Sequence, residues 1–95
     1  MIVQIIKLRS NLSEEALLNK AREREPGFKA IPGLIQKYYV KLNQPNHYGG
    51  VYIWDSKESL KKHRESDLAA SIPEAYQLME APNIEIMDVL FKLRD

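Results

Sequence analysis

The sequence predicts an α+β domain with one four-stranded antiparallel sheet that carries helices on one face. The first observation is the order of its segments, which read strand, helix, strand, strand, helix, strand and so match the split βαβ pattern. The second is residues 49–54 (GGVYIW), which are apolar or aromatic on both faces of an extended strand, so both faces should be covered. Together these observations predict a ferredoxin-like sandwich.

Composition limits the possible functions of the chain. Its 95 residues should form one domain. With 14 basic and 13 acidic residues the net charge is +1, so neither nucleic acid nor an anionic membrane is an expected partner. Cys is absent, which excludes disulfides, thiolate metal sites and cysteine nucleophiles. No apolar run approaches the length of a membrane span and no signal peptide is recognisable, so we expect a cytoplasmic protein.

The first half of the chain predicts a strand and a helix. Residues 1–8 read as a strand with two mainly apolar faces. Ser13 is a good helix N-cap, and Leu12 and Leu17 can form a hydrophobic staple across it. Pro26 and Gly27 should end this helix, and residues 25–33, with two Pro and two Gly, should form a structured loop.

The second half predicts a hairpin, a helix and a last strand. Residues 34–42 and 49–54 should pair as antiparallel strands around the turn-rich residues 43–48, which include His47. Residues 55–58 resemble a capping box that opens a helix over residues 56–66, followed by short turns over 67–73 and 73–78. Residues 84–93 read as the last strand. Because the helices supply few large apolar residues, we expect the helix-free face to pair with a second copy, giving a homodimer.

His63 is the residue best suited to chemistry. It follows Leu60, the one large apolar residue of its helix, by three positions, so it should point toward the sheet or along the edge of the buried face. A neutral imidazole there can act as a general base, a hydrogen-bond donor or an iron ligand. The alternative is a half-buried His satisfied by one hydrogen bond.

Aromatic and amide side chains are candidates for a binding pocket. Tyr52 and Trp54 share one face of their strand and could be walls for a flat substrate or core filling. Gln4 interrupts an apolar strand face and could orient a ligand or bond a Tyr hydroxyl across the sheet. Tyr39 and Tyr76 add further phenols, a bias that suggests a polar-lined cavity.

Signatures of common cofactors are missing from the sequence. It has no glycine-rich phosphate loop, no dinucleotide fingerprint and no nucleophile elbow. Its two His residues have no close His or carboxylate spacing, so no metal site is expected. An enzyme with this sequence should therefore work without a cofactor or borrow one.

Two parts of the chain resemble a known family. Residues 54–68 (WDSKESLKKHRESDL) are similar to the strand-to-helix signature of antibiotic biosynthesis monooxygenase-like domains: a Trp, an acidic capping turn, a His nine residues later and then a Ser. Residues 32–37 and 49–52 resemble the YdhR-like monooxygenase-like proteins of the same dimeric α+β barrel superfamily. The resemblance covers residues 1–93.

The resemblance implies a homodimer whose sheets face one another, with a pocket between sheet and helices in each subunit. Oxygenase relatives oxidise polycyclic aromatic substrates there without flavin or metal. Trp54 and His63 match family positions, whereas Tyr52 stands where many relatives have a carboxylate. The haem-degrading branch has a Trp at the position of His63 and a His at that of Pro73, so haem degradation is not expected.

The main hypothesis is a cofactor-independent monooxygenase for a small or polycyclic phenolic or quinol-like aromatic. His63 would hold the phenolic proton, Tyr52 or Gln4 would hydrogen-bond the oxyanion, and Trp54 would wall the ring. The alternative is a non-catalytic, small-molecule-binding or stress-related dimer, and a proton-transfer isomerase is a third possibility. A cavity in which a phenol or amide converges on His63 favours an enzyme. A filled core around Trp54 with His63 turned to solvent favours a non-enzyme.

Overall fold

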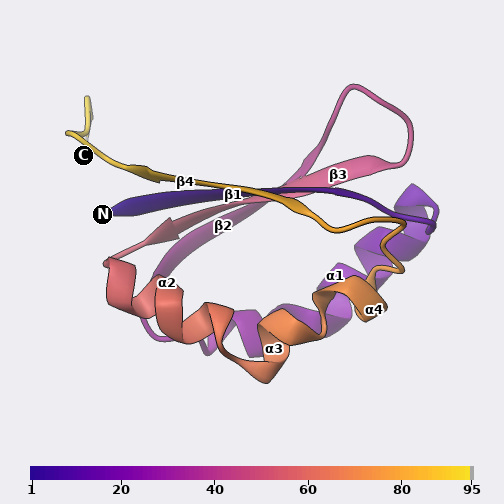
Figure 1. Ribbon diagram of the computed structural model, residues 1–95, viewed down its shortest axis with the longest axis horizontal. Helices are drawn as coiled ribbons and strands as arrows, with labels where there is room; N and C mark the ends of the chain where they lie inside the picture. The colour runs from indigo at the N-terminus through magenta and orange to yellow at the C-terminus, as the bar shows by residue number, and fades with distance from the viewer. Residues whose placement is uncertain (95) are drawn as a thin grey trace.

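The structure is a computed structural model that describes residues 1–94. Its elements in chain order are β1 (Ile2–Arg9), α1 (Glu14–Lys29), β2 (Leu34–Lys41), β3 (His47–Trp54), α2 (Lys57–Arg64), α3 (Asp67–Ala70), α4 (Ile72–Ala75) and β4 (Asn83–Asp88). Figure 1 shows the helices on one side of the sheet and both chain ends at the same end of it. The predicted order of elements is confirmed.

The four strands form one antiparallel sheet in the order β2-β3-β1-β4. This is the ferredoxin-like arrangement, as the sequence predicts. Ile2 pairs with Trp54 of β3 on one side and with Asp88 of β4 on the other, so β1 lies in the middle of the sheet.

The hydrophobic core lies between the sheet and the helices. Alternate residues of β1 and β3 face it, which is the period-2 pattern of a half-covered sheet. The buried apolar residues of the core are Ile2, Ile6, Leu17, Ala21, Phe28, Tyr48, Tyr52, Trp54, Leu60, Ile72 and Tyr76. Ser13 and Ser56 cap α1 and α2 by accepting hydrogen bonds from the backbone N–H groups of Ala16 and Ser59, both at 3.2 Å.

The predicted end of the first helix is wrong. α1 continues through Pro26 and Gly27 to Lys29, so only residues 30–33 remain as a loop. A Pro inside a helix costs about 3 kcal/mol because it removes one backbone hydrogen bond. Phe28 offsets this cost, since the extra helical turn buries its ring against Tyr52.

The boundaries of all four strands also differ from the prediction, and β2 ends at Lys41, one residue earlier than predicted. β1 is shifted by one residue, and β3 begins at His47 rather than at residue 49 because His47 pairs with Arg9. β4 ends at Asp88 rather than at residue 93. Asp88 pairs with Ile2, where β1 begins, so residues beyond Val89 have no neighbouring strand to bond.

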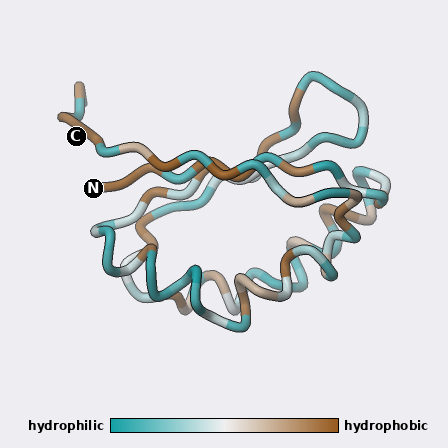
Figure 2. Tube along the Cα trace, viewed as in Figure 1, coloured by the Kyte–Doolittle hydropathy of each residue, from teal (hydrophilic) through white to brown (hydrophobic). Residues whose placement is uncertain are grey.

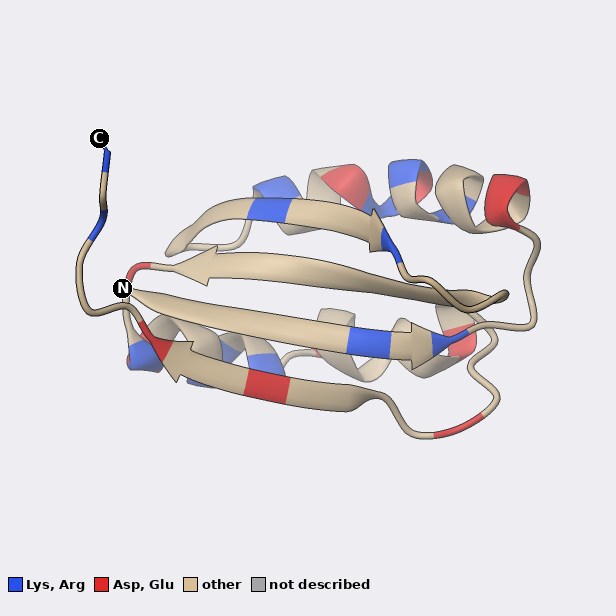
Figure 3. Cartoon of the chain, turned by 90° about the horizontal axis from the view of Figure 1, so that it is seen from above, with Lys and Arg blue, Asp and Glu red and all other residues tan. Residues whose placement is uncertain are grey.

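The second sheet face carries no helix. Figure 3 views this face and shows few charged positions along the central strands. Val3 and Ile5 of β1 face the same side as Val51 and Ile53 of β3, because each pairs directly with its neighbour in the register. The expectation that both faces of β3 are covered therefore holds within this chain for one face only.

The segment after β4 is apolar and exposed. Leu90, Phe91 and Leu93 are 92%, 80% and 83% exposed, and Figure 2 shows hydrophobic positions near the C-terminal end of the trace. No helix among residues 1–94 is long and apolar enough to cross a membrane.

Candidate functional site

α2 brings His63 into the core. Its N-cap Ser56 fixes where the helix starts, so Leu60 and His63 lie one turn apart and both are only 4% exposed. The prediction that His63 points toward the sheet or along the edge of the buried face is confirmed. His63 is not turned to solvent.

The His63 imidazole lies among aromatic rings. Its centroid is 5.3 Å from Trp54, 5.9 Å from Phe28 and 6.1 Å from Tyr52. Its Nε2 is buried and makes no hydrogen bond to any residue among 1–94. Burial lowers the pKa of His63, and the nearby charge of Lys37 lowers it further, so the ring is neutral near pH 7. A neutral imidazole has a lone pair with which to accept a proton.

Trp54 and Gln4 form a buried, hydrogen-bonded pair on the face of the sheet that the helices cover. Trp54 is fully buried and stacks on Tyr52, with ring centroids 6.0 Å apart and an interplanar angle of 2°. The Trp54 Nε1–H donates to the Gln4 Oε1 at 3.0 Å. Gln4 therefore bonds an indole and not the Tyr hydroxyl considered from the sequence. In this position Trp54 fills the core.

Three Tyr side chains surround a small inner cavity between the sheet and the helices. Tyr39, Tyr52 and Tyr76 line it, and its volume is about 30 Å³, which is room for about one water molecule. Tyr52 and Tyr76 are buried, whereas Tyr39 is 41% exposed at the rim. The Tyr76 hydroxyl makes no hydrogen bond within the described chain.

The phenols of this cavity are held in their protonated form. Burial raises the pKa of Tyr52 and of Tyr76, and the pKa of Tyr39 rises to about 12 for the same reason. They can therefore donate hydrogen bonds to a ligand oxygen, as the sequence-based hypothesis requires of Tyr52. Ser10 helps to place Tyr76 by donating to its backbone carbonyl at 2.6 Å.

Two further pockets reach His63 from outside. One, of about 180 Å³, lies between β1, β4 and the helices and is also lined by Gln4 and Ile6. The other, of about 320 Å³, lies between the end of α1 and α2 and is also lined by Ser59 and Lys62. His63 is thus reached from two sides, although the inner cavity itself is nearly closed.

Lys37 is a site residue that the sequence-based reasoning missed. Its ammonium nitrogen lies 3.6 Å from the ring centroid of Phe28, 4.3 Å from that of Tyr39 and 4.6 Å from that of Tyr52. Burial, and then the charge of Arg24, lowers the pKa of Lys37 to about 7. Gly50 leaves room for it, since a Cβ at position 50 would lie 3.3 Å from the Lys37 Cε.

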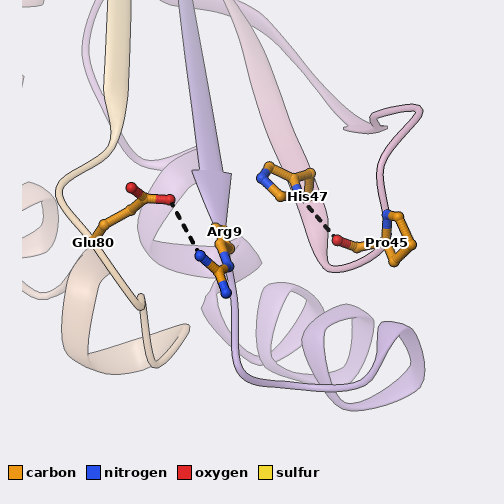
Figure 4. A network of polar contacts seen from close by, with 4 residues as sticks. All are labelled: Arg9, Pro45, His47 and Glu80. Carbon is orange, nitrogen blue, oxygen red and sulfur yellow. Dashed lines mark hydrogen bonds and ion pairs between the residues drawn. The ribbon is translucent and has the colours of Figure 1, made fainter.

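The largest recess lies away from these residues. It has a volume of about 730 Å³ at the β2–β3 hairpin and is lined by Arg9, His47 and Glu80, but by none of the predicted site residues. Figure 4 shows its polar contacts: Arg9 pairs with Glu80 at 4.0 Å, and the His47 Nδ1 lies 2.9 Å from the carbonyl of Pro45. Among residues 1–94, no three His, Asp or Glu side chains lie close enough to hold a metal ion.

Comparison with solved structures places this architecture in a known fold class. The chain has the fold of the antibiotic biosynthesis monooxygenase-like proteins, which its sequence resembles. It is similar to SnoaB, a cofactor-independent oxygenase from Streptomyces nogalater, with a TM-score of 0.78, 9% identity and coverage of 99% of this chain and 97% of that one.

Two other solved structures have the same fold. A protein of unknown function from Nitrosomonas europaea has a TM-score of 0.78 and 21% identity, over 96% of this chain and 90% of that one. An antibiotic biosynthesis monooxygenase has a TM-score of 0.72 and 17% identity, over 95% and 99%. No protein-family model and no curated protein matches the sequence.

Proposed function

We propose that this chain is a small oxygenase that acts, without a cofactor of its own, on a phenolic or quinol-like aromatic. The observation that carries the proposal is His63, a buried and neutral imidazole whose Nε2 has no partner among residues 1–94 and which lines two pockets. The shared fold of SnoaB, named a cofactor-independent oxygenase, supports it.

In the proposed reaction, His63 accepts the proton that an acidic phenol or activated CH₂ group loses. The Tyr52 hydroxyl donates a hydrogen bond to the oxyanion that results. The electron-rich anion then passes one electron to O₂, and the two radicals combine to a peroxide anion on carbon, which takes the proton back from His63. Loss of water from this peroxide turns the CH₂ carbon into a carbonyl. One oxygen atom of O₂ enters the product and the other leaves as water, so the substrate supplies every electron.

Homodimer formation is part of the proposal. The helix-free face of β1 and β3 is apolar, and the exposed Leu90, Phe91 and Leu93 continue the apolar surface beyond β4. Large apolar patches on a single chain are typical of surfaces that become covered. A second copy of this chain is the proposed partner.

The test is oxygen uptake with a panel of polycyclic quinols, measured for wild type and for His63→Ala. We expect His63→Ala to lower turnover by about 10²- to 10⁴-fold, the usual range for a general base. His63→Gln should not restore turnover because an amide does not accept the proton. The control is His47→Ala, which removes the other imidazole at the distant hairpin. Equal turnover by wild type and His63→Ala would refute the role of His63.

One observation favours the second candidate, a non-catalytic binding protein. The core around Trp54 is filled, and the inner cavity holds about 30 Å³, far less than a polycyclic substrate needs. Binding of a quinol with micromolar affinity and without oxygen uptake would support the non-catalytic binding protein.

A further inference from the structure

Two partly buried cations on α1 and β2 have no acidic partner. No carboxylate of the described residues forms an ion pair with Lys37 or with Arg24. Arg24 donates to the Leu68 carbonyl at 3.2 Å and to the Ser71 hydroxyl at 3.1 Å, and its Nε is buried without a partner. Charges removed from water are normally paired in proteins, so two neighbouring, partly buried cations without a counter-ion are unusual.

A hydroxyl donor lies beside these cations. The Arg24 guanidinium lies over the rings of Phe28 and Tyr76, 5.6 Å from each centroid, and the proton of the buried Tyr76 hydroxyl has no acceptor among residues 1–94. Glu25 lines the recess between α1 and β2 as well, but its carboxylate is paired there with Arg22 at 3.9 Å and with Lys29 at 3.6 Å.

Lys37 lies between the inner cavity and a recess at the surface. It lines the inner cavity and, on its other side, a recess of about 410 Å³ between α1 and β2. Phe28, Leu34 and Tyr39 line the same recess, so it offers apolar and aromatic walls next to the ammonium group. A recess of this volume accommodates a two-ring aromatic molecule.

We propose that the recess between α1 and β2 binds an aromatic anion, whose rings pack on Phe28 and Leu34 and whose negative charge is held by Lys37. The inference deepens the proposed function, on which it rests for the link to catalysis, because it makes the substrate an ionised aromatic acid or phenolate. An anion supplies the counter-charge that Lys37 lacks within the described chain.

The charge of Lys37 should control the affinity for such an anion. With a pKa of about 7, Lys37 is cationic below neutral pH and loses its charge above it. The titratable and charged groups that face it are Arg24, Glu25 and Lys29 from α1, Tyr39 from β2, Tyr52 from β3, His63 from α2 and Tyr76, which follows α4. The pKa of His63 is lowered and those of the three Tyr are raised, so these groups keep one protonation state near neutral pH.

The test compares two probes with the same rings, 2-naphthoate and the neutral 2-naphthalenemethanol, by calorimetric titration. At about pH 6.5 we expect Lys37→Met to weaken naphthoate binding about 10- to 100-fold, the contribution of one hydrogen bond to a charged group. Binding of the neutral probe should change less than about threefold in the same variant. The matched control is Lys41→Met on the same strand, which removes an exposed Lys paired with Glu14 and should leave both affinities unchanged.

A second variant keeps the test decisive if Lys37→Met does not fold. Wild-type affinity for naphthoate should fall as the pH rises from about 6.5 to about 8.5, whereas Lys37→Arg, whose charge persists, should keep it constant. Absence of naphthoate binding to wild type, equal losses for both probes, or an affinity for Lys37→Arg that falls with pH as in wild type would each overturn the proposal. Neither probe needs O₂ to bind. Naphthoate binding through Lys37 without oxygen uptake from any quinol would therefore refute the oxygenase and keep the anion site.

Discussion

Trp54→Phe should destabilise the protein mainly through the polar group that it leaves behind. The change removes the hydrogen bond of 3.0 Å to the Gln4 Oε1 and keeps most of the stacking on Tyr52. A lost hydrogen bond costs about 1 kcal/mol, and an orphaned buried acceptor costs a further 1–3 kcal/mol, giving about 2–4 kcal/mol in total. For a domain of this size that lowers Tm by about 10–30 °C.

The double variant Trp54→Phe/Gln4→Leu isolates this effect. Because it removes both polar partners together, it should be more stable than the sum of the single changes by about 1–3 kcal/mol. The control double variant combines Trp54→Phe with Gln36→Leu. Gln36 is exposed and its side chain accepts a hydrogen bond from the next backbone N–H, so the two changes in stability should be additive. Urea unfolding at one fixed protein concentration measures all six proteins, which are wild type, the three single variants and the two double variants. Additivity of Trp54→Phe and Gln4→Leu within about 0.5 kcal/mol would show that the buried bond is not made.

Two other predictions concern assembly and pH. Sedimentation at micromolar concentration should give one species of about twice the 11.0 kDa chain, and Ile53→Glu on the helix-free face should give a monomer; a folded wild-type monomer would contradict the dimer. Because the pKa of Lys37 is about 7 in the folded protein and 10.5 for a solvated Lys, the unfolded chain binds more protons between these values, so stability should rise from about pH 7 to about pH 9. The urea midpoint should rise with pH in wild type and rise less in Lys37→Met. An equal rise with pH in both proteins would show that the Lys37 amine is solvated in the folded state.

The parts of the fold that local sequence controls were predictable. Strand and helix types follow from periodicity and caps, and the burial of His63 follows from its spacing to Leu60 on one helix. The end of β4 was not predictable in this way. β4 ends at Asp88 because this residue pairs with Ile2, the first residue of β1. The two residues lie near opposite ends of the chain, so local sequence does not reveal their pairing.

The polar pair in the core shows a second limit. The sequence singled out Gln4 as a buried amide that needs a partner, and this requirement holds in the structure. The identity of the partner depends on the register between β1 and β3, in which Gln4 stands opposite Tyr52 and beside Trp54. Spacing along one strand carries no information about that register.

The overlooked Lys37 and the wrong end of α1 have one physical cause. A Lys in an alternating strand normally keeps its ammonium group in water, so its position alone predicts a solvated side chain. Here the ammonium lies 3.6 Å from the Phe28 centroid, and Phe28 occupies that place only because α1 continues through Pro26. If the helix ended at Pro26, the aromatic group nearest to Lys37 would be gone and the amine would be more hydrated. The extra helical turn thus shields Lys37 from water, and it also forms one wall of the recess that we propose for an aromatic anion.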